Sequence, residues 1–454
     1  MKYGKKVNPQ TMKSNTALFL MFLFLTMHTG AAAQQQPQLS REQVRETVQE
    51  LSSSLMANYV FPEKAANASV LLHSGIDGGL YDKILDPNLL ASTLFKELQP
   101  VLNDKHFRIV YNPALEKEVL SYNSRPVQLS ADVQSEKNKN FYFRKIEILP
   151  GNVGYLEFNG FALPNKDFRR TLGFVMGYLA NCEALIIDLR SNRGGNGKSS
   201  EEILSYFFER NTYIGRSYNR ISDQWSSSYV KGYKSNRNSI HLNMPIYLLT
   251  GKNTYSAGEG FAYALQQQRG SKVVGTQTSG AAHLTRSFSL GNGFVGYIPY
   301  QRTENAKTGT DWEGTGVIPD VTTMENALII AHNLILADKI AKTTGKEKDV
   351  FLWMINYNKS MLSSGKLTDT NLSCFTGRFA EFEITGKDGQ LFFRDVNQKN
   401  TVPAVMVPID QDFYQVKKDY QVRFESLKNG QYQDVRVYWS DGYSEKIERL
   451  HTLE

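Results

Sequence analysis

The sequence predicts a mixed α/β protein with an N-terminal helical bundle, a layered α/β core and a C-terminal antiparallel β domain. Three observations predict this order. Amphipathic helical patterns fill residues 38–110, and strand–turn–helix units recur across 111–345. Short alternating strands, separated by glycine-containing turns, then follow in the stretch 372–454. A chain of 454 residues is long enough for several domains of this kind.

Residues 1–33 are expected to be a cleaved secretory signal and not part of the fold. Four lysines precede the apolar run 16–27, and three alanines at 31–33 provide the small residues of a signal peptidase site. The run is too short to span a bilayer comfortably, and no later stretch approaches that length. An exported protein, periplasmic or extracellular and without an integral membrane span, is therefore expected. Removal of the segment lowers the formal net charge by four, from +7 to +3, which is too little to indicate a nucleic-acid partner.

Three helices are expected in the N-terminal part. A capping box at Ser40 opens the first, Pro62 opens the second, and Asp86 before Pro87 opens the third. Apolar residues recur at helical spacing behind these starts, which indicates a small helical bundle. The helical period ends near residue 103, where a strand pattern begins.

The core is expected to begin with the polar, irregular segment 112–140. A hairpin over 141–158 follows, and then alternating helices and strands, of which the strand 184–189 is apolar throughout and therefore buried on both faces. The later elements are expected at 201–208 (helix), 246–250 (strand), 257–267 (helix), 272–275 (strand), 287–298 (hairpin) and 325–342 (helix).

Cysteine and histidine usage gives no sign of a metal centre. Cys182 and Cys374 lie in different expected domains, and Cys182 fits a small core position as well as a disulfide. The seven histidines are scattered, and no Cys/His cluster has the spacing of zinc ligands. We therefore expect neither a metal nor another cofactor.

Ser256 lies where the strand 246–250 gives way to the helix 257–267. A serine at such a junction exposes its hydroxyl, while the free N–H groups of the first helical turn point at developing negative charge. Such a junction is a suitable position for a nucleophilic serine. Serine is also a preferred N-cap, so the local pattern fits a plain helix cap equally well.

A glycine-rich turn at residues 191–195 follows the buried strand 184–189. Its backbone can approach a substrate closely and donate N–H groups to an oxyanion. A tight structural turn or a phosphate nest fits the same residues, although the P-loop pattern is absent. The candidate bases for Ser256 are His106 and His283, and Glu313 is a candidate carboxylate to orient a base.

Four blocks lie in a fixed order along the core, at 185–195, 254–259, 274–283 and 312–320. Together they resemble peptidase family S41, the tail-specific, tricorn-like and interphotoreceptor-retinoid-binding-protein-like group. Residues 58–63 and 104–106 resemble the helical domain of the retinoid-binding-protein-like branch.

The resemblance implies a crotonase-like ββα core and amide hydrolysis through an acyl-enzyme on Ser256. The oxyanion would be held by the N–H of Ala257 and that of Gly194 or Gly195. Tail-specific members use a lysine after a glycine that here precedes Ala281, so a lysine base is not expected.

The tricorn-like arrangement uses a histidine from the N-terminal domain and a late glutamate, and His106 and Glu313 occupy the matching positions. A serine precedes that histidine in the family, where this chain has Lys105. The segment 112–140 leaves no room for the PDZ domain of many relatives, so tail selection by such a domain is not expected.

The sequence thus predicts an exported serine endopeptidase that acts on peptide or protein substrates, with Ser256 as nucleophile, His106 as base and Glu313 as orienting group. His283 is expected to contact the substrate, and exchange of roles between the two histidines stays open. The alternative is a non-catalytic binding protein for apolar, retinoid-like or fatty-acid-like ligands on the same fold. Retention of the serine, the histidine, the glutamate and the glycine turn together favours the peptidase.

Overall fold

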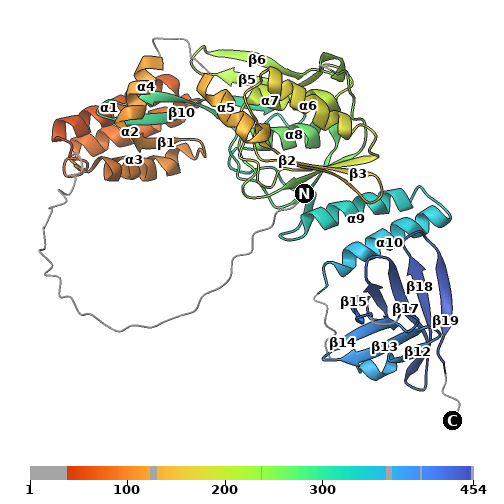
Figure 1. Ribbon diagram of the computed structural model, residues 1–454. Coiled ribbons are helices and arrows are strands. Elements are labelled where there is room, and N and C mark those ends of the chain that lie inside the picture. The colour runs from red at the N-terminus through yellow and green to blue at the C-terminus, as the bar shows by residue number, and fades with distance from the viewer. Residues whose placement is uncertain (1–37, 123–129, 237, 364–370, 399–400, 451–454) are drawn as a thin grey trace, which may run out of the picture.

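The computed structural model describes residues 38–122, 130–236, 238–363, 371–398 and 401–450. The expected signal segment, 1–33, lies outside these residues. Figure 1 shows a helical part at one end, an α/β core in the middle and a β domain at the other end. The predicted mixed α/β architecture, with helices first and an antiparallel β domain last, is confirmed.

The N-terminal part is built from three helices that begin where the sequence predicts. They are α1 (Arg41–Asn58), α2 (Pro62–Asp77) and α3 (Pro87–Leu102). Ser40 and Gln43 form the predicted capping box, and Asp86 caps α3 by accepting two backbone N–H groups. The helices bury a common core with residues that come much later in the chain, such as Phe294 and Ile298.

Those later residues belong to the hairpin of β9 (Leu284–Ser289) and β10 (Phe294–Asn305). Strand β1 (Arg108–Tyr111) pairs antiparallel with β10 and so ties the helical part to the core. The predicted domain boundary at residues 110/111 stays a prediction. The hairpin, which lies after that boundary, shares one hydrophobic cluster with the helices before it.

The expectation of an irregular segment over 112–140 is wrong. Helices α4 (Pro113–Tyr122) and α5 (Ser130–Asn138) lie there. Helix α4 is anchored by polar contacts, because Glu116 accepts hydrogen bonds from the Ser289 hydroxyl (2.6 Å) and the Gly293 N–H (2.8 Å). Hydrophobic periodicity cannot reveal a helix that polar tertiary contacts hold in place.

A six-stranded sheet forms the centre of the core, in the order β11-β8-β7-β4-β3-β2. All neighbours pair parallel except the β2–β3 hairpin. The strands are β2 (Phe143–Leu149), β3 (Val153–Phe158), β4 (Ala184–Asp188), β7 (Ile246–Thr250), β8 (Lys272–Gly275) and β11 (Val321–Thr322).

Helices cover both faces of this sheet. Successive side chains of a strand point to opposite faces, and here both faces carry apolar side chains that must be buried. On one face, strand residues such as Ile187 and Leu248 pack against the helices α6 (Lys166–Tyr178), α7 (Gly197–Leu204) and α8 (Ala257–Arg269). On the other face, Ile186 and Leu249 pack against α9 (Ala327–Ile340). Figure 1 shows α6, α7 and α8 on one side of the strands and α9 on the other.

One expectation for the core needs correction, and two strands of the core were not predicted. The helix expected at 201–208 begins earlier, since Asn196 caps α7 by accepting the Lys198 N–H (3.0 Å), and it ends in a short 3-10 turn at Ser205–Phe207. The sequence also gave no sign of strands β5 (Thr212–Asn219) and β6 (Gln224–Val230), which extend the sheet of β1 and β10 in the order β1-β10-β5-β6.

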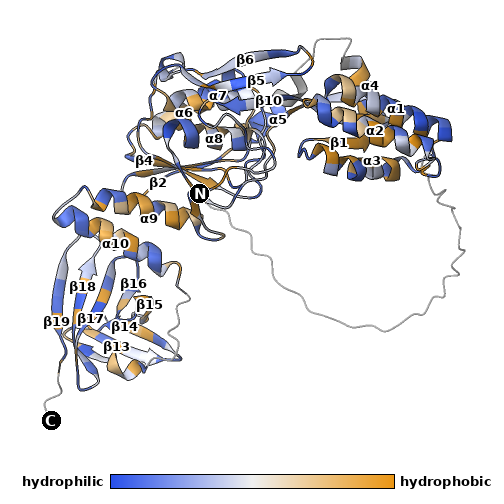
Figure 2. Ribbon diagram, turned by 180° about the vertical axis from the view of Figure 1, so that it is seen from behind, coloured by the Kyte–Doolittle hydropathy of each residue, from blue (hydrophilic) through white to orange (hydrophobic). Residues whose placement is uncertain are grey.

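The C-terminal part consists of eight antiparallel strands paired in sequence order, preceded by α10 (Lys346–Ser360). The strands are β12 (Gly377–Phe379), β13 (Phe382–Lys387), β14 (Gln390–Asp395), β15 (Ala404–Asp410), β16 (Phe413–Val416), β17 (Tyr420–Lys428), β18 (Gln431–Trp439) and β19 (Ser444–Glu448). A bridge between Phe379 and Arg449 joins the first strand to the end of the last, so the sheet closes into a barrel. Figure 2 shows apolar residues on its strands and on α9 and α10.

Two further observations concern the chain as a whole. Cys182 and Cys374 are both free, and Cys182 is buried in the core. Among the described residues, no helix combines the length and the apolar character needed to cross a bilayer.

Candidate active site

Ser256 occupies a strained turn between β7 and α8. Its backbone has φ 53° and ψ −120°, a conformation that side-chain-bearing residues rarely adopt and that is found mainly where function requires it. Ser256 and Glu259 form a capping-box pair at the start of α8, but an ordinary N-cap residue has an extended backbone, so a plain cap does not require the positive φ of Ser256. This arrangement favours the nucleophile over the plain cap.

The buried side chain of Glu259 holds this turn in place through hydrogen bonds. Its fully buried carboxylate accepts the backbone N–H of Ser256 (2.9 Å), the Thr278 hydroxyl (2.5 Å) and the N–H groups of Gly280 (2.6 Å) and Ala281 (2.9 Å). Burial raises the pKa of this carboxyl, while the hydrogen bonds oppose the shift. Glu259 was not among the predicted site residues, although its place three residues after Ser256 is that of a capping-box acid.

The glycine turn after β4 lies against the nucleophile. A Cβ on Gly194 would come within 2.9 Å of the Ser256 Cβ and 3.1 Å of the Ala257 nitrogen, and the φ of Gly194 is +88°. A Cβ on Gly195 would come within 2.4 Å of the Phe161 carbonyl oxygen. Both positions therefore require glycine.

Only one of the two glycines keeps its N–H available to an oxyanion. The Gly194 N–H donates to the Asn192 side-chain oxygen at 2.9 Å. Within the part of the chain that the structure describes, neither the Gly195 N–H nor the Ala257 N–H donates to another protein group. Of the expected donors, Gly195 and Ala257 fit and Gly194 does not.

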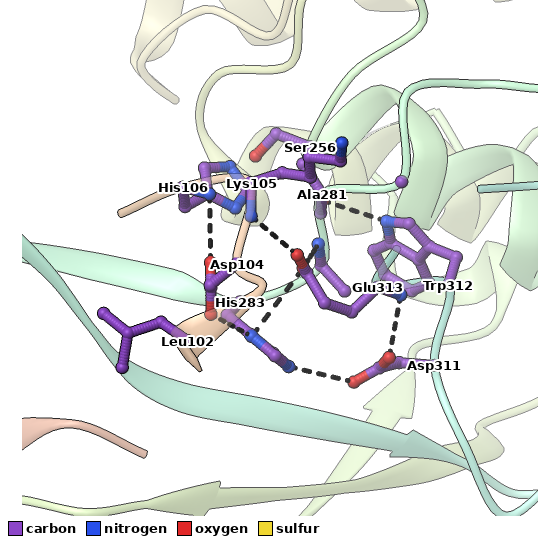
Figure 3. Close-up of polar contacts among 12 residues, drawn as sticks. Leu102, Asp104, Lys105, His106, Ser256, Ala281, His283, Asp311, Trp312 and Glu313 are labelled. Carbon is purple, nitrogen blue, oxygen red and sulfur yellow. Dashed lines mark hydrogen bonds and ion pairs between the residues drawn. The ribbon is translucent and has the colours of Figure 1, made fainter. Parts of the chain in front are cut away.

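His106 reaches the core from the loop between α3 and β1. Its ring packs edge-on against Tyr255, the neighbour of Ser256, with 4.9 Å between ring centroids. The Tyr255 hydroxyl also donates to the Lys105 carbonyl at 3.1 Å. The helical part thus docks across the strand–helix turn, and Figure 3 shows His106 and Ser256 on these facing segments.

The surroundings of the His106 ring keep it in its neutral form. Its Nδ1 is buried without a hydrogen-bond partner among the described residues. Burial, which outweighs the attraction of the nearby Asp104 carboxylate, lowers the pKa of His106 to about 4. The ring is therefore unprotonated at neutral pH and able to accept a proton.

His283 lies in a cage of carboxylates beneath His106 (Figure 3). Its Nδ1 is 2.6 Å from Asp104 Oδ2 and 3.7 Å from Glu313 Oε2, and its Nε2 is 3.5 Å from Asp311 Oδ2. Burial by itself lowers the pKa of His283, but the hydrogen bonds to Asp104 and Asp311 and the negative charges around it raise the pKa to about 9. The ring is a cation at neutral pH and has no lone pair with which to act as a base.

The contact of His283 with a substrate stays a prediction. The residue is only 4% exposed and carboxylates face both ring nitrogens, but it lines a pocket of about 330 Å³ together with Phe61 and Glu313. The Phe61 ring stands edge-on to His283 at 5.4 Å, and the Tyr59 hydroxyl donates to Asp104 Oδ2 at 3.4 Å.

Glu313 acts on the backbone of both histidine loops. Its carboxylate accepts the N–H of Lys105 (2.8 Å), next to His106, and the N–H of Ala282 (2.6 Å), next to His283. Burial raises the pKa of this carboxyl. No hydrogen bond between Glu313 and the His106 ring occurs among the described contacts, so Glu313 positions the loop and does not orient the ring directly.

Asp104 contacts both histidines. It was not predicted as a site residue and belongs only to the block 104–106 that resembles the family. Its Oδ1 accepts the backbone N–H of His106 at 3.0 Å, while its Oδ2 faces His283. Asp104, His283 and Glu313 present atoms of the types that bind metals, all within 4.8 Å of one another. A metal ion bound at these atoms would have to displace the proton of His283.

Two family models match this chain. "Peptidase family S41" matches residues 152–323, and "N-terminal domain of peptidase S41 in eukaryotic IRBP" matches residues 32–145. Together they cover more than half of the sequence and include Ser256, His106 and both glycines. The chain belongs to peptidase family S41.

A curated relative is the chloroplastic carboxyl-terminal-processing peptidase 2 of Arabidopsis thaliana, 28% identical over 144 residues. The match covers 31% of this chain and only 26% of that protein's length.

Two solved structures are similar to part of this chain. A protein of Parabacteroides merdae described as a peptidase is 20% identical, with a TM-score of 0.46, over 64% of this chain and 92% of its own. The photosystem II D1 C-terminal processing protease is 14% identical, with a TM-score of 0.42, over 62% of this chain and 93% of its own. Because these TM-scores lie below 0.5, the family assignment rests on the two family models.

Proposed function

We propose that the protein is an exported serine endopeptidase that cleaves peptide bonds through an acyl-enzyme on Ser256. The observation that carries the proposal is the backbone strain at Ser256, together with the unused N–H groups of Gly195 and Ala257 beside it. A ligand carrier has no need of a strained serine beside two free donors.

In the proposed reaction, the Ser256 hydroxyl oxygen attacks the substrate carbonyl while the His106 ring accepts the hydroxyl proton. The carbonyl oxygen becomes an oxyanion and accepts hydrogen bonds from the Gly195 and Ala257 N–H groups. His106 then returns the proton to the leaving amine as the C–N bond breaks. Water, deprotonated by His106, hydrolyses the ester and releases Ser256.

One charge near His106 supports its role as base, and other effects oppose it. The Asp104 carboxylate attracts the imidazolium that forms when His106 takes the proton, and its Oδ1 accepts the His106 backbone N–H at 3.0 Å. Burial and the positive charges of His283 and Arg108 act against the imidazolium and lower the pKa of His106 to about 4. We assign Asp104 and Glu313 the role of holding the His106 loop.

Export is proposed from the signal-like sequence of residues 1–33. Mass spectrometry of the exported material tests it. A mature N-terminus near Gln34 is expected, and an intact Met1 would exclude cleavage.

The proposed nucleophile is tested with a fluorophosphonate, a reagent that reacts with activated serines. We expect covalent labelling at Ser256, located by peptide mass spectrometry. Labelling and casein hydrolysis are both expected to fall by several orders of magnitude in Ser256→Ala, with little change in Tm. Ser227→Ala, which alters an exposed serine of β6, is the matched control and keeps full activity.

The alternative, an apolar-ligand binder, draws support from the description of the second family model, which names eukaryotic IRBP. The same preparations distinguish the two. Saturable binding of retinol or a fatty acid, combined with absence of labelling and hydrolysis in the wild type, would replace the peptidase with a carrier.

A further inference from the structure

An exposed arginine lies beside the proposed base. Arg108 is the first residue of β1 and follows His106 by two positions. Its neighbours Phe107 and Ile109 are buried in the hydrophobic cluster of the helical part, whereas Arg108 itself is exposed. Strand β1 is the outer strand of its sheet, in the order β1-β10-β5-β6. Arg108 is therefore accessible from solvent next to the loop that carries His106.

The guanidinium of Arg108 is held in place without an ion pair. Its Nη1 donates to the Phe107 carbonyl at 2.6 Å, and the group lies over the Phe95 ring of α3, at 5.3 Å from the ring centroid. Among the described residues, no carboxylate forms an ion pair with Arg108. A guanidinium carries several N–H donors in a planar fork, so most of them are left for a further acceptor.

The charge of Arg108 reaches the groups around Ser256. Burial lowers the pKa of His106, and the positive charge of Arg108 adds to this lowering. Burial raises the pKa of Tyr255, the residue before Ser256, and the charge of Arg108 opposes this rise. Coulombic effects weaken with distance, so the guanidinium lies close to both residues.

A cation at this place is unfavourable for a base that must itself become a cation. His106 accepts the Ser256 proton during acylation, and Arg108 repels the imidazolium that forms. A carboxylate that pairs with Arg108 offsets this repulsion. Such a carboxylate would thus contribute to binding and also strengthen the base.

We propose that Arg108 binds an acidic side chain of the peptide substrate, so that cleavage beside Asp or Glu is preferred. The proposal rests on the proposed peptidase function and specifies its substrate class. The planar guanidinium matches a carboxylate with two parallel hydrogen bonds. An endopeptidase cuts within a chain, where the carboxylates near the scissile bond belong to the side chains of Asp and Glu. A neutral residue in their place leaves Arg108 unpaired.

The test maps cleavage sites by mass spectrometry in a mixture of synthetic peptides of diverse sequence, each amidated at its C-terminus. In the wild type, Asp and Glu are expected to be enriched at one position relative to the scissile bond. The enrichment should disappear in Arg108→Gln and give way to Lys and Arg in Arg108→Glu. For one cleaved peptide, the ratio of kcat/KM between its Glu and Gln forms should fall by about threefold to tenfold in Arg108→Gln.

Arg144→Gln is the matched control. Arg144 lies on β2, the outer strand of the central sheet, and is also exposed and without an ion pair among the described residues. This variant should keep the enrichment of acidic residues. Fluorophosphonate labelling at Ser256 shows for each variant that the protein is folded and its nucleophile reactive.

The pH dependence of labelling distinguishes the proposed role from a merely structural one. The charged or titratable side chains around His106 are those of Asp104 and Arg108 in its own segment, His283 before β9 and Tyr255 before α8. Arg108→Gln removes one of the positive charges, so the pKa of His106 should rise and the acidic limb of the labelling rate should move to higher pH. The control variant should leave this limb in place.

Three results would contradict the proposal in different ways. If Ser256 is labelled but acidic residues are not enriched, or if Arg108→Gln changes neither the enrichment nor the acidic limb, the role of Arg108 is wrong and the peptidase function stands. If the wild type shows neither labelling nor cleavage, both proposals are wrong. If cleavage requires a free C-terminal carboxylate, measured with the same peptides without the amide, the chain terminus replaces the acidic side chain.

Discussion

At the scale of single residues, the two histidines of the site differ in protonation, because different groups face their ring nitrogens. His106 has a buried Nδ1 without a partner, and its pKa is lowered to about 4. His283 faces carboxylates on both sides, and its pKa is raised to about 9. One ring is therefore a free base at neutral pH and the other a fixed cation. This difference in protonation favours His106 as the base more strongly than the match of its sequence position to the family does.

Replacement of each histidine tests these roles. His106→Ala is expected to lower the rate of Ser256 acylation by about a hundredfold or more, since a general base is lost. His283→Gln is expected mainly to lower Tm, because it leaves the buried Asp104 carboxylate without its charged partner. Stopped-flow labelling with a fluorophosphonate and thermal melts measure the two effects. If His283→Gln abolishes acylation while His106→Ala does not, the roles must be exchanged.

The raised pKa of His283 also predicts a pH dependence of stability. The folded protein binds this proton more tightly than the unfolded chain does, where the pKa is about 6.5. The stabilisation is therefore complete below about pH 6.5 and is lost as the pH rises to about 9. The Tm difference between the wild type and His283→Gln should be largest at pH 6 and shrink towards pH 9. A difference that stays constant or grows with pH would show that His283 is neutral in the folded protein.

At the scale of elements, the site depends on two turns that lie against each other: the glycine turn after β4 and the strained turn before α8. A Cβ on Gly194 would meet the Ser256 Cβ and the Tyr255 carbonyl oxygen, each at 2.9 Å. A Cβ on Gly197, three residues further on, would meet nothing within 4 Å. Gly194 in the turn and Gly197 at the start of α7 thus provide a test and its control.

Gly194→Ala is expected to reduce fluorophosphonate labelling by about a hundredfold, because the added methyl group displaces Ser256 from the oxyanion donors. The positive φ adds a stability cost of about 1–3 kcal/mol, measured by urea unfolding. Gly197→Ala is expected to keep full activity, with stability unchanged or slightly higher. Normal labelling of a folded Gly194→Ala protein would mean that the glycine turn does not support the nucleophile.

At the scale of the whole molecule, the C-terminal barrel has a hydrophobic core of its own. That cluster contains only residues from Leu372 onward, and the clusters of the core and the helical part contain none of them. Residues 364–370, which precede the barrel, lie outside the described residues. Helix α10 packs on α9 as well as on the barrel, so it belongs with both neighbours.

We expect a chain that ends at Ser363 to fold and to keep fluorophosphonate labelling at Ser256, because its main clusters are intact. Exposure of the barrel-facing side of α10 should lower solubility without changing the labelling rate. The measurements are size-exclusion chromatography, thermal melting and labelling, with the full mature chain as reference. An insoluble or unlabelled product would show that the barrel is required for the core to fold.

The sequence by itself determined the elements whose signals are local. Capping residues and apolar spacing predicted α1, α2 and α3, and a continuous apolar run predicted β4 as a buried strand. Ser256 and the glycine turn were also found, because a strand–helix junction and adjacent glycines are visible in a few consecutive residues. Helix α4 was missed, since its anchor is a hydrogen bond that Glu116 accepts from Ser289, in a hairpin more than 170 residues away.

Only the tertiary structure decided which atoms meet at the site. Asp104 and His283 are 179 positions apart, and Lys105 and Glu313 are 208 apart. Whether a histidine is neutral or charged depends on burial and on such distant carboxylates, and neither is readable from its neighbours in the chain. For the same reason the sequence could name both histidines, but only the folded arrangement distinguishes the free base from the buried cation.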